Sequence, residues 1–241
     1  MIEYSGSSTY KALCHVPRSS TTSQPHPCLI HLHGAGEAGQ RVWEIIAEGQ
    51  TGTPPVELHF GRAPQVLAER FIVVAPQSPR SRWSTEGILS FVSELLANPP
   101  VGASFDRSRI YISGHSNGAS GALEAAAMGM HGQRPERFAA CIPVAPGGCS
   151  RAVGHLAQTP VWIFHGTNDI VLPIRCADEV YSVLRDAHDG DEVDASRLRY
   201  TQIHDCPAPP GYPSCVGHGT PVVAWATEGI FEWLLSHHVD A

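Results

Sequence analysis

The segment 109–130 constrains the fold of this chain more than any other. A short apolar, β-branched run at 109–113 leads into Gly-His-Ser-Asn-Gly at 114–118, and an alanine-rich stretch without proline follows at 119–130. A strand that turns directly into a helix through G-x-S-x-G is typical of a nucleophile elbow. In so tight a turn the two glycines must lack a Cβ so that strand and helix can approach. We therefore predict that Ser116 lies in this turn, with its hydroxyl raised above a sheet edge.

Similar strand and helix patterns extend along the rest of the chain. Apolar runs predict strands at 10–17, 28–32, 71–75, 138–145, 161–164 and 198–203, and helical spacing predicts helices at 85–97, 173–187 and 222–235. This alternation predicts an α/β fold with a mainly parallel sheet flanked by helices. Ligands of such sheets bind beyond the carboxyl ends of the strands. The segments of interest lie at these ends, at 33–36, 76–78, 114–118 and 165–169.

The composition limits the classes of partner. A chain of 241 residues, 42% of them hydrophobic, can bury one sizeable core, so we expect a single domain over 1–241. The formal charge of −7 and the lack of a long basic run make nucleic acid and anionic membranes poor partners. No apolar stretch approaches the ~18–20 residues of a membrane span. Residues 1–6 lack a signal-peptide pattern, so the chain as written is expected in the cytoplasm, or outside the cell if a signal has been removed. The oligomeric state stays open.

A serine nucleophile needs a base, and the base needs an acid to orient it. In the chain order of hydrolases the acid follows the serine and the histidine comes last. Asp169 follows the predicted strand 161–164 on a short glycine-containing turn and is the expected acid. An ordinary turn aspartate is the alternative for this position, and the rival acids lie in or after the next predicted helix: Asp178, Asp186 and Asp189.

His218 is the expected base. Glycines on both sides of His218 would let it project inward from its loop, between the last predicted strand and the final helix. His204, at the end of that strand, is the alternative base, whereas His237 and His238 are expected to be exposed tail residues.

An oxyanion hole requires two backbone N–H groups aimed at the developing negative charge. The N–H of Asn117 follows the nucleophile at the positive end of the alanine-rich helix. The second donor is expected in the loop after the strand 28–32, from Ala35, with Gly36 as the alternative.

These motifs resemble those of the α/β-hydrolases, in particular the esterase group that includes polyhydroxybutyrate-depolymerase-like and feruloyl-esterase-like enzymes and predicted peptidases. The matching segments run in order from about residue 28 to the end: 33–37, 76–77, 114–118, 138–140, 165–169 and 217–218. The resemblance implies Ser116 as nucleophile, Asp169 as acid and His218 as base, and no cofactor. The chain departs from the pattern at Ala119, where a second glycine is common, and at 206–215, which looks like an insertion.

The walls of the site follow from the same reasoning. Only twelve residues separate Gly147 from Pro160, too few for a cap domain, so the site should be open and walled by 37–66, Trp83 and the loop 206–215. Further expected substrate contacts are Gly36, Gln77 and His115. Trp83 either packs in the core or stacks on an aromatic or sugar group.

Ester hydrolysis is the expected reaction, on a small-molecule or polymer-derived ester, because an alkoxide leaves with less protonation than an amine. A peptidase or lactonase with the same triad, or a ligand-binding protein with this fold, are the alternatives.

Two further patterns are weaker. His31 and His33 would share one face of a strand, but no H-E-x-x-H motif or paired cysteine spacing accompanies them, so we expect no metal. Cys206 and Cys215 bracket a proline-rich loop, and a disulfide between them is as well supported as two free thiols. The other five cysteines fit small buried apolar side chains: Cys14, Cys28, Cys141, Cys149 and Cys176.

Overall fold

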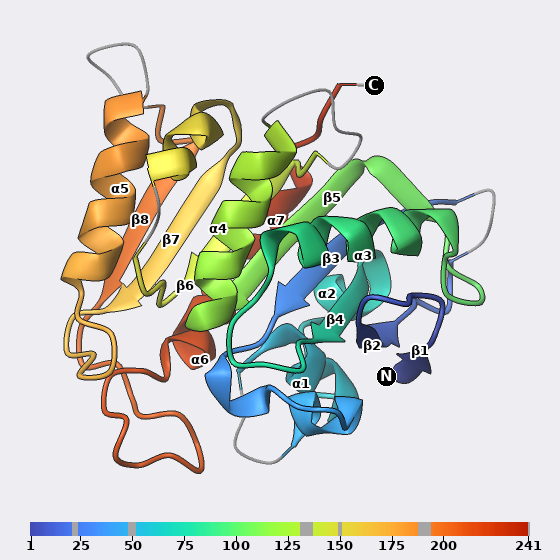
Figure 1. The fold of residues 1–241 in the computed structure, drawn as a ribbon, viewed down its shortest axis with the longest axis horizontal. Helices are drawn as coiled ribbons and strands as arrows, with labels where there is room; N and C mark the ends of the chain where they lie inside the picture. The colour runs from blue at the N-terminus through green and yellow to red at the C-terminus, as the bar shows by residue number, and fades with distance from the viewer. Residues whose placement is uncertain (21–23, 48–51, 131–136, 149–150, 188–193, 241) are drawn as a thin grey trace.

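The chain builds a twisted, mostly parallel sheet (Figure 1). The computed structural model describes residues 1–20, 24–47, 52–130, 137–148, 151–187 and 194–240. In these residues the strand order is β1-β2-β4-β3-β5-β6-β7-β8. β1 and β2 are antiparallel to their neighbours, and β3 to β8 run parallel. The strands are β1 (Ile2–Tyr4), β2 (Lys11–His15), β3 (His26–Leu32), β4 (Ile72–Gln77), β5 (Phe105–His115), β6 (Ala140–Val144), β7 (Val161–Gly166) and β8 (Leu198–Ile203).

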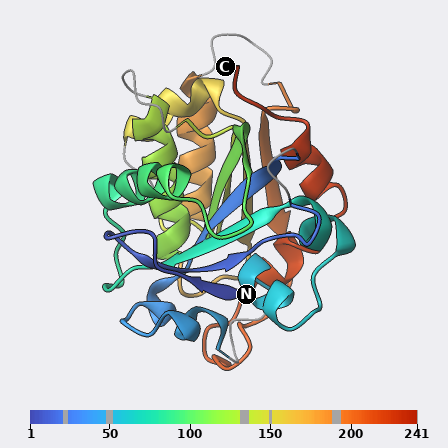
Figure 2. The same cartoon turned by 90° about the vertical axis from the view of Figure 1, so that its right-hand side faces the viewer.

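Helices cover both faces of this sheet (Figure 2). One face carries α3 (Thr85–Ala97), α4 (Asn117–Met130), α5 (Arg175–Ala187) and the 3₁₀ segment η3 (Arg151–Gln158). The opposite face carries α2 (Gln65–Arg70), α6 (Thr220–Ala224) and α7 (Ile230–Leu235). There α1 (Pro54–His59) and the 3₁₀ segment η2 (Val42–Ile46) pack under β2 and β4. A third 3₁₀ segment, η1 (Ala35–Glu37), follows β3.

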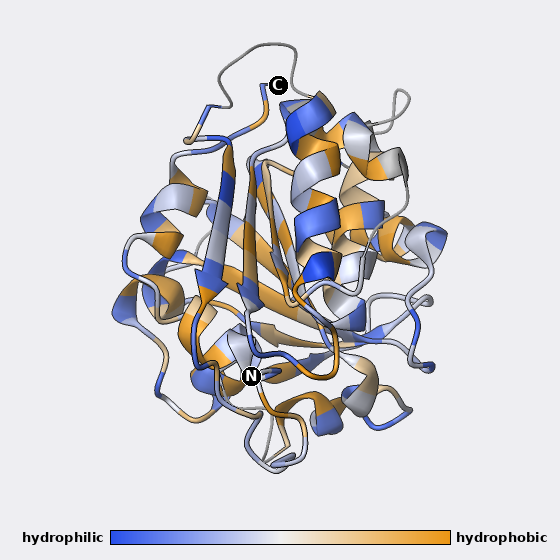
Figure 3. Ribbon diagram, turned by 90° about the vertical axis from the view of Figure 1, so that its left-hand side faces the viewer, coloured by the Kyte–Doolittle hydropathy of each residue, from blue (hydrophilic) through white to orange (hydrophobic). Residues whose placement is uncertain are grey.

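The central strands are mostly apolar where both of their faces are buried, which in β5 begins at Ile110 (Figure 3). Their side chains alternate between the two layers, as the period of two requires. On β5, Ile110 and Ile112 join the α3/α4/α5 layer, whereas Tyr111 joins the α2/α6/α7 layer. On β7, Ile163 and Phe164 divide in the same way. The α/β-hydrolase architecture predicted from the sequence, a mainly parallel sheet flanked by helices, is confirmed.

Three local predictions were incomplete or wrong. The helix predicted over 222–235 is two short helices, α6 and α7, separated by a turn that ends at Gly229 with φ 78°. The short edge strand β1 was missed, since two of its three residues are exposed and only Tyr4 is buried. The region 35–70 contains short helical segments that carry no long periodic pattern.

Between β6 and β7 the described residues contain η3 and no inserted domain, which agrees with the expected lack of a cap. Among the helices that the structure describes, none has the length and apolar character to cross a bilayer.

Candidate active site

Ser116 occupies a strained turn between β5 and α4. Its φ of 56° is in the left-handed region, which is uncommon for a residue with a side chain. A Cβ on Gly114 would lie 2.2 Å from the carbonyl oxygen of Gly118, and a Cβ on Gly118 would lie 2.1 Å from the carbonyl oxygen of Leu32. Only glycine therefore permits this approach of strand and helix, which is the reason the sequence pattern gave for both glycines.

Asp169 and His218 form a short hydrogen bond, although 49 residues separate them in the chain. Nδ1 of His218 lies 2.7 Å from Oδ2 of Asp169, and both side chains are buried. The carboxylate accepts this N–H, so Nε2 of His218 is left with a free lone pair. Oδ1 of Asp169 accepts two further hydrogen bonds, from the backbone N–H groups of Val171 at 2.8 Å and Leu172 at 2.9 Å.

The hydrogen bonds set the charge of the acid. Burial disfavours the carboxylate, but the hydrogen bonds from His218 and from the two backbone amides outweigh it, so the pKa of Asp169 lies below its ordinary value. Asp169 is therefore an anion at neutral pH, held beside the imidazole. His165 also approaches Asp169, at 3.6 Å, but its Nε2 lies 2.7 Å from the carbonyl oxygen of Leu172, to which it donates.

The rival acids and bases lie elsewhere. Asp178, on α5, accepts a hydrogen bond from the Tyr200 hydroxyl at 2.9 Å, and Asp186 pairs with the neighbouring Arg185. Asp189 lies outside the described residues. His204 is exposed, and its Nδ1 lies 3.4 Å from the Thr167 hydroxyl. The structure thus brings His218, and not His204, to Asp169.

Two loops hold the acid and the base together. The side chain of Asn168 donates to the carbonyl of Cys206 and accepts from the N–H of the same residue, each at 3.0 Å. A Cβ on Gly217 would lie 2.5 Å from the Cα of Asp169, so the chain before His218 passes directly against the acid. The N–H of Gly219 donates to the carbonyl of Pro207 at 2.8 Å and closes the base of the loop 207–218.

Ser116, His218 and the loop after β3 line one cavity of about 230 Å³. Its walls combine the expected site residues with a set of apolar side chains, and the lining residues are Gly34, Ala35, Gly36, Glu37, His115, Ser116, Val171, Pro209, Tyr212, Cys215 and His218. No direct hydrogen bond joins Oγ of Ser116 to His218 among these described residues. In enzymes without substrate this contact is often long and tightens on binding.

The two expected oxyanion donors are each the first residue of a helical segment. Ala35 is the first residue of η1 and Asn117 the first of α4, so neither N–H has an acceptor within its own helix. The side chain of Asn117 donates to the carbonyl of Ser81 at 2.9 Å, so the expected oxyanion donor of this residue is its backbone N–H. His115 stands beside the site, with Nε2 at 3.2 Å from the carbonyl oxygen of His218 and the two rings 4.8 Å apart.

Gln77 and Trp83 border the site without lining this cavity. Gln77 is buried, and its amide donates to the carbonyl of Glu37 at 2.8 Å. The indole N–H of Trp83 donates to the carbonyl of His33 at 3.0 Å, and the two rings lie 4.7 Å apart. Trp83 and Asn117 line a neighbouring cavity of about 500 Å³. Both predicted contact residues therefore donate hydrogen bonds to the loop after β3.

The two strand histidines are used inside the protein. Nδ1 of His31 lies 3.0 Å from the Ser113 hydroxyl, and burial lowers the pKa of His31 to about 3. His33 accepts the N–H of Ser78 at Nε2, 2.9 Å away, so its Nδ1 carries the proton and donates to the carbonyl of Gly34 at 2.6 Å. The described residues contain no group of three or more metal-ligating side chains.

The cysteines are free thiols where the structure describes them. Sγ of Cys206 lies 3.6 Å from the Thr220 hydroxyl. Cys215 lines the cavity and forms no disulfide with Cys206. Cys14, Cys28 and Cys141 are buried, as small apolar residues would be, whereas Cys176 is half-buried and Cys149 lies outside the described residues. The disulfide considered from the sequence is thus absent in this structure.

Comparison with known proteins identifies solved structures that share the fold of this chain. No protein-family model matches the chain, and no curated protein matches it. Among solved structures, it is similar to an esterase described as thermostable, with 24% identity and a TM-score of 0.74 over 95% of this chain and 59% of that one. It is also similar to acyl-protein thioesterase 2 of Zea mays, with 16% identity and a TM-score of 0.59 over 93% and 97% of the two chains. The chain has the α/β-hydrolase fold.

The chain spans about three-fifths of the length of the thermostable esterase. At identities this low, the likeness extends to the fold alone.

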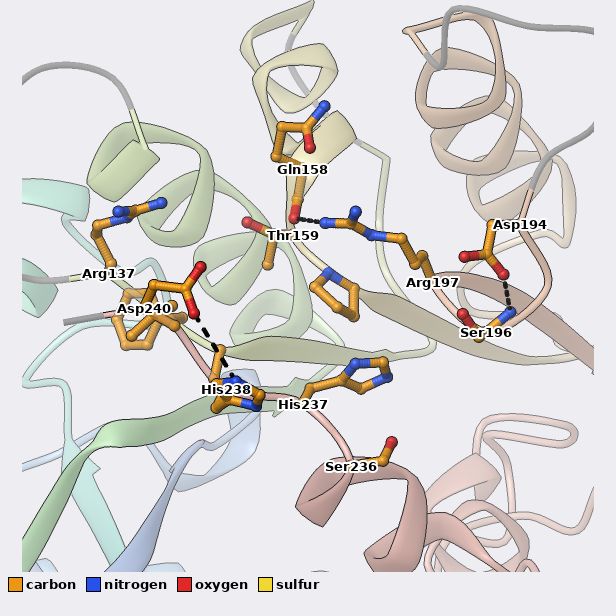
Figure 4. A pocket seen from close by; sticks show the side chains of 14 residues that line it. Arg137, Gln158, Thr159, Asp194, Ser196, Arg197, Ser236, His237, His238 and Asp240 are labelled. Atoms are coloured by element: carbon orange, nitrogen blue, oxygen red, sulfur yellow. Dashed lines mark hydrogen bonds and ion pairs between the residues drawn. The ribbon is translucent and has the colours of Figure 1, made fainter.

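A larger cavity of about 750 Å³ lies at the other end of the sheet, before β6, β7 and β8 begin (Figure 4). Arg137, Arg197, Asp194 and Asp240 are among its lining residues, so opposite charges are mixed there. Arg197 donates to the carbonyl of Gln158. His237 belongs to this wall and is half-buried against Trp233, which corrects its prediction as an exposed tail residue, whereas His238 is exposed. In the α/β-hydrolase fold ligands bind at the opposite, carboxyl ends of the strands.

The sequence assigned no specific role to several of the lining residues. Glu37 ends the motif 33–37 and begins the predicted wall 37–66, and it is buried although a charged loop residue is ordinarily solvated. Val171, Pro209 and Tyr212 reach the cavity only through the folding of their loops, although the predicted wall 206–215 contains two of them. The wall expected from 37–66 is represented in the described residues by Glu37 alone.

Proposed function

We propose that this protein is a serine hydrolase that cleaves carboxylic esters through an acyl-enzyme. Ser116 is the nucleophile, His218 the general base and Asp169 the acid that orients the imidazole. The observation that carries the proposal is the 2.7 Å hydrogen bond between the buried side chains of Asp169 and His218. His218 lines the same cavity as Ser116. We further propose that residues 1–241 act as one catalytic domain, since strands from both ends of the chain enter the same sheet.

The reaction follows from the hydrogen-bond roles. Nε2 of His218 takes the proton of the Ser116 hydroxyl while the oxygen attacks the acyl carbonyl. The carbonyl oxygen becomes an oxyanion and is received by the N–H groups of Ala35 and Asn117. The imidazolium then gives its proton to the departing alcohol, and a water molecule, activated by the same histidine, releases the acid. The Asp169 carboxylate stabilises the imidazolium at each step.

An ester is the preferred substrate class because its alkoxide needs less proton transfer than an amine. The cavity is small and its walls are mostly apolar, with Val171, Pro209 and Tyr212 around the nucleophile. These features favour an uncharged acyl group. Both similar structures carry esterase or thioesterase in their names, which agrees with acyl transfer to water.

A fluorophosphonate probe tests the assignment. We expect a single adduct on Ser116 by peptide mass spectrometry, and loss of labelling in His218→Ala. His204→Ala is the matched control, because it removes an exposed imidazole from a nearby loop and should label like the wild type. A folded protein that takes no adduct would refute the proposal and favour a ligand-binding role. Labelling that persists in His218→Ala would refute the assignment of the base.

A further inference from the structure

Glu37 is a buried acid beside the nucleophile that the proposed reaction does not use. It ends η1, lines the cavity of Ser116 and is 5% exposed. A Cβ built on Gly34 would lie 3.4 Å from Oε2 of Glu37, 3.5 Å from Nδ1 of His115 and 3.5 Å from Cβ of Ser116. The carboxyl, the neutral imidazole and the nucleophile therefore surround one point on the oxyanion loop.

The imidazole of His115 offers Glu37 no positive charge. His115 approaches from the end of β5, and burial, aided by His218 and His31, lowers its pKa to about 3, so it is uncharged. Because Nε2 of His115 donates to the carbonyl of His218, its Nδ1 presents a lone pair toward Gly34. No lysine or arginine of the described residues lines this cavity.

Burial therefore governs the carboxyl. It raises the pKa of Glu37 to about 7, against opposing hydrogen bonds from the backbone of Glu37 and Gly34 and the nearby His218. The Asp169 carboxylate is hydrogen-bonded to Nδ1 of His218. An acid in this position can lose its proton within the pH range in which the proposed triad works.

The protonation state of Glu37 affects the charge next to the expected oxyanion site. The loop 34–37 carries the amide expected to receive the oxyanion, and a carboxylate in the same loop would repel that charge in a cavity with little water. A neutral carboxyl would not. We propose that Glu37 is a positioning residue that must keep its proton for the oxyanion loop to function, so that its ionisation switches the hydrolase off as the pH rises.

This inference rests on the proposed function, and the pH profile of kcat/KM tests it. The substrate is an uncharged short-chain ester whose products are measured by chromatography, so that neither substrate nor detection titrates. In the wild type, kcat/KM should rise as the imidazole loses its proton and then fall by about tenfold per pH unit once Glu37 ionises. Glu37→Gln, which cannot ionise, should lose the falling limb. Glu37→Leu should lose it as well, and circular dichroism checks the folding of both.

Glu44→Gln is the matched control, because Glu44 is a half-exposed acid that pairs with Arg41 in the next segment. It should keep the wild-type profile. A wild-type profile without a falling limb, or a limb that survives in both Glu37 variants, overturns the inference.

Labelling of Ser116 and the pH profile together distinguish failure of the proposed role of Glu37 from failure of the proposed function. If Ser116 takes the fluorophosphonate but the falling limb is absent, Glu37 has no such role and the hydrolase assignment stands. If neither adduct nor turnover is found, the hydrolase assignment itself fails. The infrared band of a protonated carboxyl, measured at about pH 6 where ordinary carboxyls are ionised, should be present in the wild type and missing in Glu37→Gln. This band reports the proton without turnover, and its absence from the wild type overturns the inference.

Discussion

Replacing Asp169 with asparagine tests the proposed triad with the smallest change of shape. The asparagine oxygen can still accept the two backbone hydrogen bonds that Oδ1 of Asp169 receives at 2.8 and 2.9 Å. The other atom becomes an NH₂ group facing Nδ1 of His218 at 2.7 Å, where donor would meet donor. The imidazole must then move its proton to Nε2, and it can no longer take the proton of Ser116.

The magnitude follows from this change of tautomer. A wrong tautomer in a serine protease lowers kcat by about 10⁴-fold, which corresponds to about 5 kcal/mol of transition-state stabilisation. Losing one charge-assisted hydrogen bond should destabilise the fold by only about 1.5–3 kcal/mol. Asp169→Asn should therefore remain folded and bind substrate, with the loss in kcat and little change in KM.

Steady-state kinetics on an uncharged ester and thermal unfolding would be measured together. Asp178→Asn is the matched control: it makes the same chemical change on α5, where Asp178 accepts a hydrogen bond from Tyr200 and does not line the cavity. It should keep nearly full activity. If Asp169→Asn retained activity within about tenfold of the wild type, or if both variants lost it equally, the role of Asp169 would be refuted.

Three other measurements probe the surrounding structure. Gly118→Ala should unfold at lower temperature and lose fluorophosphonate labelling, because its Cβ would lie 2.1 Å from a carbonyl oxygen of β3, whereas Gly154→Ala, with no neighbour closer than 3.8 Å, should be tolerated. Cys206 and Cys215 should both be alkylated in denatured, unreduced protein; a mass lower by two hydrogens with neither labelled would contradict the free thiols. Because the folded pKa of Glu37 exceeds its unfolded value of 4.5, folding takes up a proton, and the free energy of unfolding should fall by up to about 3 kcal/mol between pH 4.5 and 7 relative to Glu37→Gln. Equal pH dependence in chemical denaturation of the two proteins would contradict this.

The elbow could be predicted because its determinants are local. The strand, the two glycines and the helix follow one another within 109–130, and the close approaches at Gly114 and Gly118 are required wherever this turn forms. The helix 85–97 was placed at its observed bounds for the same reason, since Ser84 caps it by accepting from the N–H of Gly87. Short-range patterns of this kind survive tertiary packing.

Other features depend on contacts that no local pattern encodes. The apolar spacing of 222–235 is compatible with one helix, but Trp225 and Phe231 pack into the α2/α6/α7 layer from separate segments. The sequence placed Glu37 only within the predicted wall 37–66, because a charged residue in a glycine-rich loop gives no periodic signal of burial. Its burial arises where three distant strand ends meet. Likewise, Tyr212 reaches the cavity through a loop whose path is set at its two ends.

Those two ends suggest how such a site can diversify. The side chain of Asn168 forms two hydrogen bonds with the backbone of Cys206, and the amide of Gly219 donates a hydrogen bond to the carbonyl of Pro207. The loop between these residues is therefore held at both of its ends. Asp169 and His218 lie next to these two anchored ends, whereas Tyr212 lies in the loop between them. Sequence between the anchors can therefore drift, lengthen or be exchanged by an engineer, changing which acyl group is accommodated while the proton-transfer apparatus keeps its alignment.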